Sequence, residues 1–150
     1  MSDDRNRRAD ELGLRALPLC LNLQANEYMD ELRSVEGIEV QIVTVIRMDD
    51  LRGIANEGTL NYVLLEEGDF LVCEQRQFGR HIHHSILASG KYVRAAGELE
   101  IALLDGEAIV MSLSNNSGHY RPRPECLDFI AEMLERLGFE VPTDSIKQSN

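Results

Sequence analysis

The stretch YVRAAGELEIALLDGEAIVMSL, residues 92–113, determines the predicted fold. Residues 92–103 alternate in character, with one face formed by Val93, Ala95, Gly97, Leu99, Ile101 and Leu103, and the other by Arg94, Glu98 and Glu100. The Asp105-Gly106 pair that follows is a strong short-range signal for a type I′ turn, and residues 108–113 supply the returning strand. We therefore expect an antiparallel hairpin with one buried face.

Shorter apolar runs precede this hairpin. Residues 62–65 and 70–73 predict two strands joined by the turn sequence EEGD at residues 66–69. Residues 38–46 are rich in β-branched side chains at alternate positions, and residues 80–87 also read as a strand. Together these runs predict an antiparallel, strongly bent β-meander of about five or six strands.

Helices are expected at both ends of the chain. A short helix between Asn26 and Gly37 carries apolar residues at near-helical spacing, and Asp49 or Asp50 is suited to cap a helical turn. Residues 126–137 form an amphipathic stripe that predicts a longer C-terminal helix. The fold class is therefore α+β, with short N-terminal helices and a C-terminal amphipathic helix.

The length and composition are typical of one globular domain. The chain has 150 residues, 43% of them hydrophobic, and no repeat or linker divides it. We expect a single domain over residues 1–150, with frayed ends at residues 1–10 and 143–150 because these segments are polar.

Charge and cysteine content exclude several classes of protein. The net charge of −11 is opposite to the basic surface of nucleic-acid-binding proteins, and it suits a basic protein partner. The three cysteines have no CxxC spacing, so neither a disulfide framework nor a thiolate zinc site is expected. The sequence has no long apolar stretch, so we expect a cytoplasmic protein without a membrane partner. The acidic charge also predicts that nucleic acid is not a partner.

Two polar segments, residues 79–85 and 117–121, contain all four histidines. On a strand over residues 80–87, His81, His83 and Ser85 would share one face, and His84 would lie with the isoleucines on the other. His84 is then either a core imidazole hydrogen-bonded to the backbone or a member of a site. The candidate catalytic residues are His84, Ser85, His119 and Tyr120.

A candidate anion site lies at the start of the last helix. Ser117, Gly118, Arg121 and Arg123 could bind a small anionic ligand, because a helix amino end and arginine forks both favour phosphate or carboxylate. The alternative is that these arginines form salt bridges with the abundant acidic residues.

Two further spacings in the sequence have simpler explanations. His81 and His83 could bind a metal with His119 as third ligand, but the signal is weak and no metal is assigned. Glu98-Leu99-Glu100 has the spacing found in some ADP-ribosyltransferases, and it equally describes two polar positions on one strand face. The sequence identifies no cofactor, and no serine-nucleophile elbow is present.

Several ordered motifs carry a resemblance. These motifs are, in chain order, His84-Ser85, Leu87-Ala88-Ser89-Gly90, Ala95-Ala96-Gly97-Glu98-Leu99, Ser117-Gly118-His119-Tyr120 with Pro122, and the closing helix. Together they resemble a module of plant IQ-motif calmodulin-binding proteins. Similar modules occur in bacterial polymorphic toxin and effector-like proteins. The resemblance covers residues 60–142 and implies a pocket formed by His84, Ser85, Ser117, His119 and Tyr120. The calmodulin-binding element itself is absent from this chain, so calmodulin is not expected as a partner.

Two functions are compatible with these features. The first is a small cytoplasmic binding or interaction module, of a bacterial toxin, effector or immunity system, with a polar His/Ser/Tyr pocket. The alternative is a small enzyme, a transferase or hydrolase, that acts on a phosphate-containing or nucleotide-like ligand in the same pocket.

Overall fold

The computed structural model describes residues 28–56, 58–117 and 124–147. The helices are α2 (Tyr28–Ser34), α3 (His84–Ala88) and α4 (Pro124–Leu137), with 3₁₀ turns η3 (Met48–Leu51) and η4 (Thr143–Ser145). The strands are β1 (Val43–Val45), β2 (Leu60–Leu65), β3 (Phe70–Glu74), β4 (Arg76–Gln77), β5 (Arg80–His81), β6 (Val93–Leu104), β7 (Glu107–Ser114) and β8 (Ile146–Lys147). No helix in these ranges is long and apolar enough to cross a membrane.

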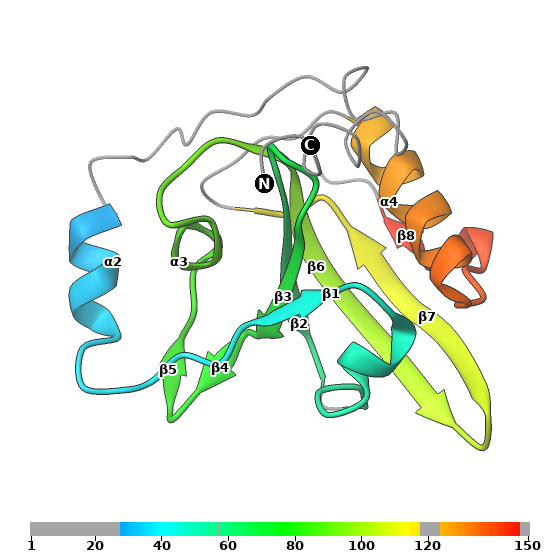
Figure 1. Cartoon of the computed structure of the whole chain (residues 1–150), viewed down its shortest axis with the longest axis horizontal. Coiled ribbons are helices and arrows are strands. Elements are labelled where there is room, and N and C mark those ends of the chain that lie inside the picture. The colour runs from blue at the N-terminus through cyan, green and yellow to red at the C-terminus, as the bar shows by residue number, and fades with distance from the viewer. Residues whose placement is uncertain (1–27, 57, 118–123, 148–150) are drawn as a thin grey trace.

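Six strands form one sheet in the order β1-β3-β2-β6-β7-β8, and β4 pairs with β5 in a separate hairpin (Figure 1). All pairs in the large sheet are antiparallel except β7 with β8. The predicted α+β class with a mostly antiparallel sheet is confirmed.

The β6–β7 hairpin forms as the sequence predicts. Leu104 pairs with Glu107, and the two turn residues Asp105 and Gly106 have φ values of 50° and 82°. Positive φ at both central positions is the geometry of a type I′ turn, and it matches the right-handed twist of the flanking strands.

The expectation that β6 is buried on one face only is wrong. A bulge opposite Leu64 and Leu65 places Val93 in a different apolar cluster from Ala95, so the two residues do not share a face. Side chains of both clusters are buried, and Figure 1 shows α3 on one side of the sheet and α4 on the other.

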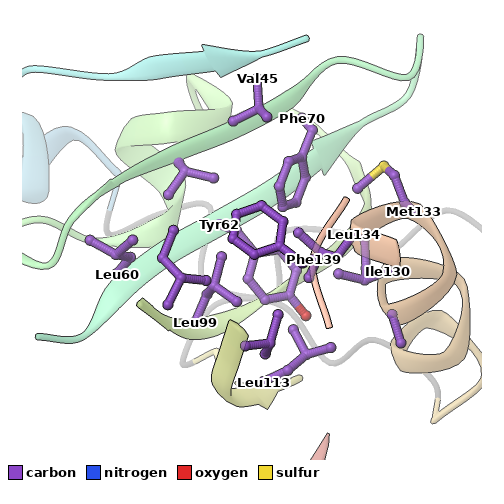
Figure 2. Close-up of a cluster of buried hydrophobic side chains, with 14 of the residues drawn as sticks. Val45, Leu60, Tyr62, Phe70, Leu99, Leu113, Ile130, Met133, Leu134 and Phe139 are labelled. Atoms are coloured by element: carbon purple, nitrogen blue, oxygen red, sulfur yellow. The ribbon is translucent and has the colours of Figure 1, made fainter. Parts of the chain in front are cut away.

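The larger cluster joins the sheet to α4. Tyr62 and Phe70 from the sheet, with ring centroids 5.7 Å apart, pack toward Ile130 and Leu134 of the helix (Figure 2). The predicted apolar stripe of α4 is buried in this cluster, and the helix ends at Leu137, before Gly138, whose φ is 110°.

The predicted strand over residues 80–87 is wrong beyond its first two residues. Only Arg80 and His81 pair as a strand, and residues 84–88 form the short helix α3. His83 precedes α3 in extended conformation, and its carbonyl accepts a hydrogen bond from the Ile86 N–H. The side chain of Asn61 donates to the Ile82 carbonyl, so a side chain takes the place of a strand partner there.

Two other segments differ from their predicted structure. Within residues 38–46 only Val43–Val45 pair as a strand, since the N–H and C=O of Gln41 both hydrogen-bond to the Gln77 side chain. Residues 143–147 form η4 and β8, and β8 pairs with β7, so fraying does not describe this part of the C-terminal segment.

Candidate functional site

His84 and Ser85 lie in the first turn of α3 and are buried, with 7% and 0% of their surfaces exposed. The His84 Nε2 atom lies 2.7 Å from the carbonyl oxygen of Gly97 on β6. This is the contact expected of a core imidazole, the first of the two interpretations of His84.

The Ser85 hydroxyl donates a hydrogen bond to Glu31 of α2, with 2.6 Å between Ser85 Oγ and Glu31 Oε1. The other carboxylate oxygen of Glu31 lies 3.3 Å from Nδ1 of His83. Glu31 is itself only 8% exposed, so one buried carboxylate ties α2 to both α3 and the residue before it. In this arrangement Ser85 acts as a buried donor that holds the carboxylate in place.

Gly97 of β6 lies against the backbone at the end of β7. A Cβ atom at this position would stand 1.8 Å from the Ser114 carbonyl oxygen and 2.7 Å from the Tyr62 hydroxyl. The Tyr62 hydroxyl donates to the same Ser114 oxygen at 2.7 Å, and burial raises the pKa of Tyr62. Only glycine therefore allows this packing, and the packing fixes the carbonyl that His84 contacts.

Beyond α3, the same face of the sheet becomes polar around Glu98. The Glu98 carboxylate accepts hydrogen bonds from the Gln75 amide at 2.6 Å and from the Asn116 amide at 2.9 Å. The Gln75 amide also donates to Asn61, which is fully buried beneath it. We refer to Gln75, His81, His83, Glu98 and Asn116 as the polar patch.

The two histidines of the polar patch contact each other. The rings of His81 and His83 meet edge to face with their centroids 4.6 Å apart. Partial desolvation of the ring lowers the pKa of His81, and so do the charges of His83 and Arg76, whereas Glu98 and Glu31 oppose the shift. The lowered pKa favours the neutral imidazole of His81, which can accept as well as donate a hydrogen bond.

The residue before the second polar segment reaches the patch. Asn116, next to Ser117, donates to Glu98, and the charge of Glu98 acts on His81. Glu98 therefore interacts with His81 of the first polar segment and with the residue that precedes the second. Gly118, His119, Tyr120, Arg121 and Arg123 lie outside the described residues, so their contribution to the pocket and to anion binding stays a prediction.

The two carboxylates of the Glu98-Leu99-Glu100 segment bind different partners. Glu100 accepts a hydrogen bond from Thr59 at 2.9 Å, whereas Glu98 accepts from two amides. Both carboxylates lie on one strand face, as the alternation predicts. Among the described side chains no group of three or more His, Cys, Asp or Glu is arranged to hold a metal ion.

Four residues that build the site were not singled out from the sequence: Glu31, Asn61, Gln75 and Asn116. Two of them had a recognisable signal. Glu31 lies between Tyr28 and Val35 at helical spacing, on the side of α2 that carries apolar residues, and Asn61 interrupts an apolar strand. A polar side chain in such a position is usually hydrogen-bonded within the fold.

A separate pocket of about 100 Å³ lies near the β6–β7 turn. Its lining includes Met48, Arg52, Leu103 and Glu107, and Arg52 is already paired with Asp49 at 2.7 Å. This volume is well below the several hundred Å³ typical of sites for organic ligands, so we assign no ligand to it.

The contact between Glu31 and Ser85 predicts a measurable coupling. We expect a double-mutant cycle of Glu31→Ala and Ser85→Ala to give an interaction energy of about 2 kcal/mol, because a buried hydroxyl donates to a carboxylate. Urea denaturation of the four proteins measures it. Asp30→Ala is the control on the same helix, since its ion pair with Arg33 is exposed and should contribute less than about 0.5 kcal/mol. Additive effects of the two substitutions would contradict a direct contact.

Comparisons of the chain with protein-family models, curated proteins and solved structures gave no match. The resemblance to the module of plant IQ-motif and bacterial toxin-like proteins therefore stays a prediction from sequence motifs.

Proposed function

We propose that this chain is a small binding module that docks a protein partner on the polar patch. The observation that carries the proposal is the fixed position of Glu98, whose two carboxylate oxygens are held by Gln75 and Asn116. Gln75 is held in turn by the buried Asn61. A surface carboxylate that is anchored through Gln75 to the buried Asn61 loses little conformational entropy on binding, which favours recognition.

The charge of the chain supports a basic partner. The net charge is −11, and the described partners of Glu98 are neutral amides, so its charge is available to a lysine or arginine of another protein. Attraction between opposite charges accelerates association and makes it sensitive to salt. Membership of a bacterial toxin, effector or immunity system belongs to the same proposal and is supported by the motif resemblance.

Position-selective cross-linking tests this function. A benzophenone amino acid at Ser117, beside the patch, should cross-link one host protein at about 50 mM salt and much less at about 500 mM. The same probe at Glu107, an exposed residue next to the β6–β7 turn, should not capture that protein. Glu98→Gln keeps the size and hydrogen-bond acceptor but removes the charge, and it should reduce the Ser117 cross-link at least about tenfold.

The proposal fails if Ser117 and Glu107 capture the same proteins, or if Glu98→Gln leaves the cross-link unchanged. An unaltered melting temperature for Glu98→Gln is the control that its fold is intact.

The second candidate is an enzyme, a transferase or hydrolase acting on a phosphate-containing or nucleotide-like ligand. The contact of Glu31 with His83 Nδ1 favours it, because a buried carboxylate that orients an imidazole is the arrangement of a general base. A thermal-shift screen of nucleotides, NAD and phosphosugars tests for the ligand pocket that an enzyme needs. A ligand that stabilises the wild type but not a folded His83→Ala variant would establish this pocket and favour the enzyme.

A further inference from the structure

The turn of the β4–β5 hairpin contains an unusual residue. Phe78 and Gly79 occupy its two central positions with φ values of 52° and 76°. Positive φ at both positions suits Asn, Asp or Gly, whereas a bulky side chain such as phenylalanine is strained there. In the described part of the chain, the other non-glycine residues with positive φ are Asn56, Ser89 and Asp105, all small and polar.

Burial does not offset this strain. Phe78 is 71% exposed, the largest exposed fraction of any large apolar side chain in the described ranges. It belongs to neither of the two apolar clusters. A single exposed apolar side chain is ordinary, but one that is also held in an unfavourable backbone conformation indicates a role outside the folding of the chain.

The hairpin is braced, so the position of Phe78 is fixed. Arg80 donates to the backbone carbonyls of Ser34, the last residue of α2, and of Glu36, and Arg76 donates to the carbonyl of Gly79 across the turn. The Gln77 side chain is hydrogen-bonded to the backbone of Gln41. Figure 1 shows this hairpin projecting beside α2, away from the large sheet.

Phe78 lies at the turn of the hairpin that carries part of the polar patch. His81 is on β5 of this hairpin, three residues after Phe78, and its ring contacts His83. An aromatic side chain at the centre with polar groups around it is the usual composition of a protein–protein interface.

We infer that Phe78 is the aromatic anchor of the docking surface, which inserts into an apolar pocket of the partner while the polar patch contacts basic residues around that pocket. This inference rests on the proposed binding function and deepens it, because it defines the partner as a protein with an apolar pocket bordered by Lys or Arg. The strained turn is the consequence of presenting a phenylalanine at the apex of a hairpin.

The substitution Phe78→Asn separates this role from a structural one. Asn adopts positive φ readily, so the variant should melt about 3 °C higher than the wild type. Its affinity for the purified partner recovered from the Ser117 cross-link should fall at least about tenfold, measured by isothermal titration calorimetry. A structural role for Phe78 would instead lower the melting temperature.

Leu104→Asn is the matched control, because Leu104 is 63% exposed and borders the type I′ turn of the β6–β7 hairpin. Its affinity for the partner should equal that of the wild type. A Phe78→Asn variant that binds as tightly as the wild type would overturn the anchor while leaving the binding function intact. Failure to recover any partner selectively at Ser117 would overturn both.

Discussion

Replacing Gly97 by alanine should destabilise the protein by about 4 kcal/mol or more, or prevent it from folding. The new methyl group would stand 1.8 Å from the Ser114 carbonyl oxygen, which belongs to the backbone of β7 and cannot rotate away. It would also stand 2.7 Å from the buried Tyr62 hydroxyl. The clash can be relieved only if β6 and β7 separate. This separation would also move the Gly97 carbonyl, which His84 contacts, and the adjacent Glu98.

Gly53→Ala is the control for this substitution. No atom lies within 4 Å of a Cβ built at Gly53, so its free energy of unfolding should change by less than about 1 kcal/mol. Urea denaturation monitored by circular dichroism compares the two variants with the wild type. A loss of less than about 1 kcal/mol for Gly97→Ala would show that the strands do not approach as closely as described.

Replacing His84 by alanine should cost about 3 kcal/mol of stability. The substitution leaves a cavity where a buried ring stood, and it removes a hydrogen-bond partner of the Gly97 carbonyl. His81→Ala is the control, because His81 is exposed and should change the stability by about 0.5 kcal/mol or less. Chemical denaturation of both variants measures the difference.

The stability and the partner affinity of His84→Ala together distinguish the two interpretations of His84. A His84→Ala protein that loses less than about 1 kcal/mol of stability but no longer binds the partner would identify His84 as a site residue. Loss of stability with unchanged affinity of the folded fraction would identify it as a core residue.

Hydrophobic periodicity and turn residues were enough to predict the longer helix and strands. The β6–β7 hairpin follows from alternation and an Asp-Gly turn, and α4 from an apolar stripe ended by glycine. Both are long enough for their periodicity to be unambiguous. The helix α3 has five residues, less than two turns, so its sequence carries no helical period and residues 80–87 also fit a strand.

The site could be predicted only in part, for a related reason. The clustering of histidines pointed to the region that contains the polar patch, but the carboxylates that organise this region come from distant positions in the chain. Glu31 and Ser85 are 54 residues apart, and Gln75 and Glu98 are 23 apart. Such pairs form because the sheet and α2 bring them together, and no periodicity in one sequence records that.

The positive φ of Phe78 was also not apparent from the sequence. The residues Gln77-Phe78-Gly79-Arg80 contain a single glycine in a segment that reads as the start of a strand. Only the pairing of β4 with β5 shows that both Phe78 and Gly79 occupy the turn.

Hydrogen exchange of the backbone amides with and without the purified partner tests the central claim most directly, because it locates the contact surface without any substitution. The account predicts slower exchange in the presence of the partner at residues 75–83 and 114–117, which carry the anchor and the polar patch, and unchanged exchange at residues 104–107. Protection confined to α4 or to the β6–β7 turn would contradict it.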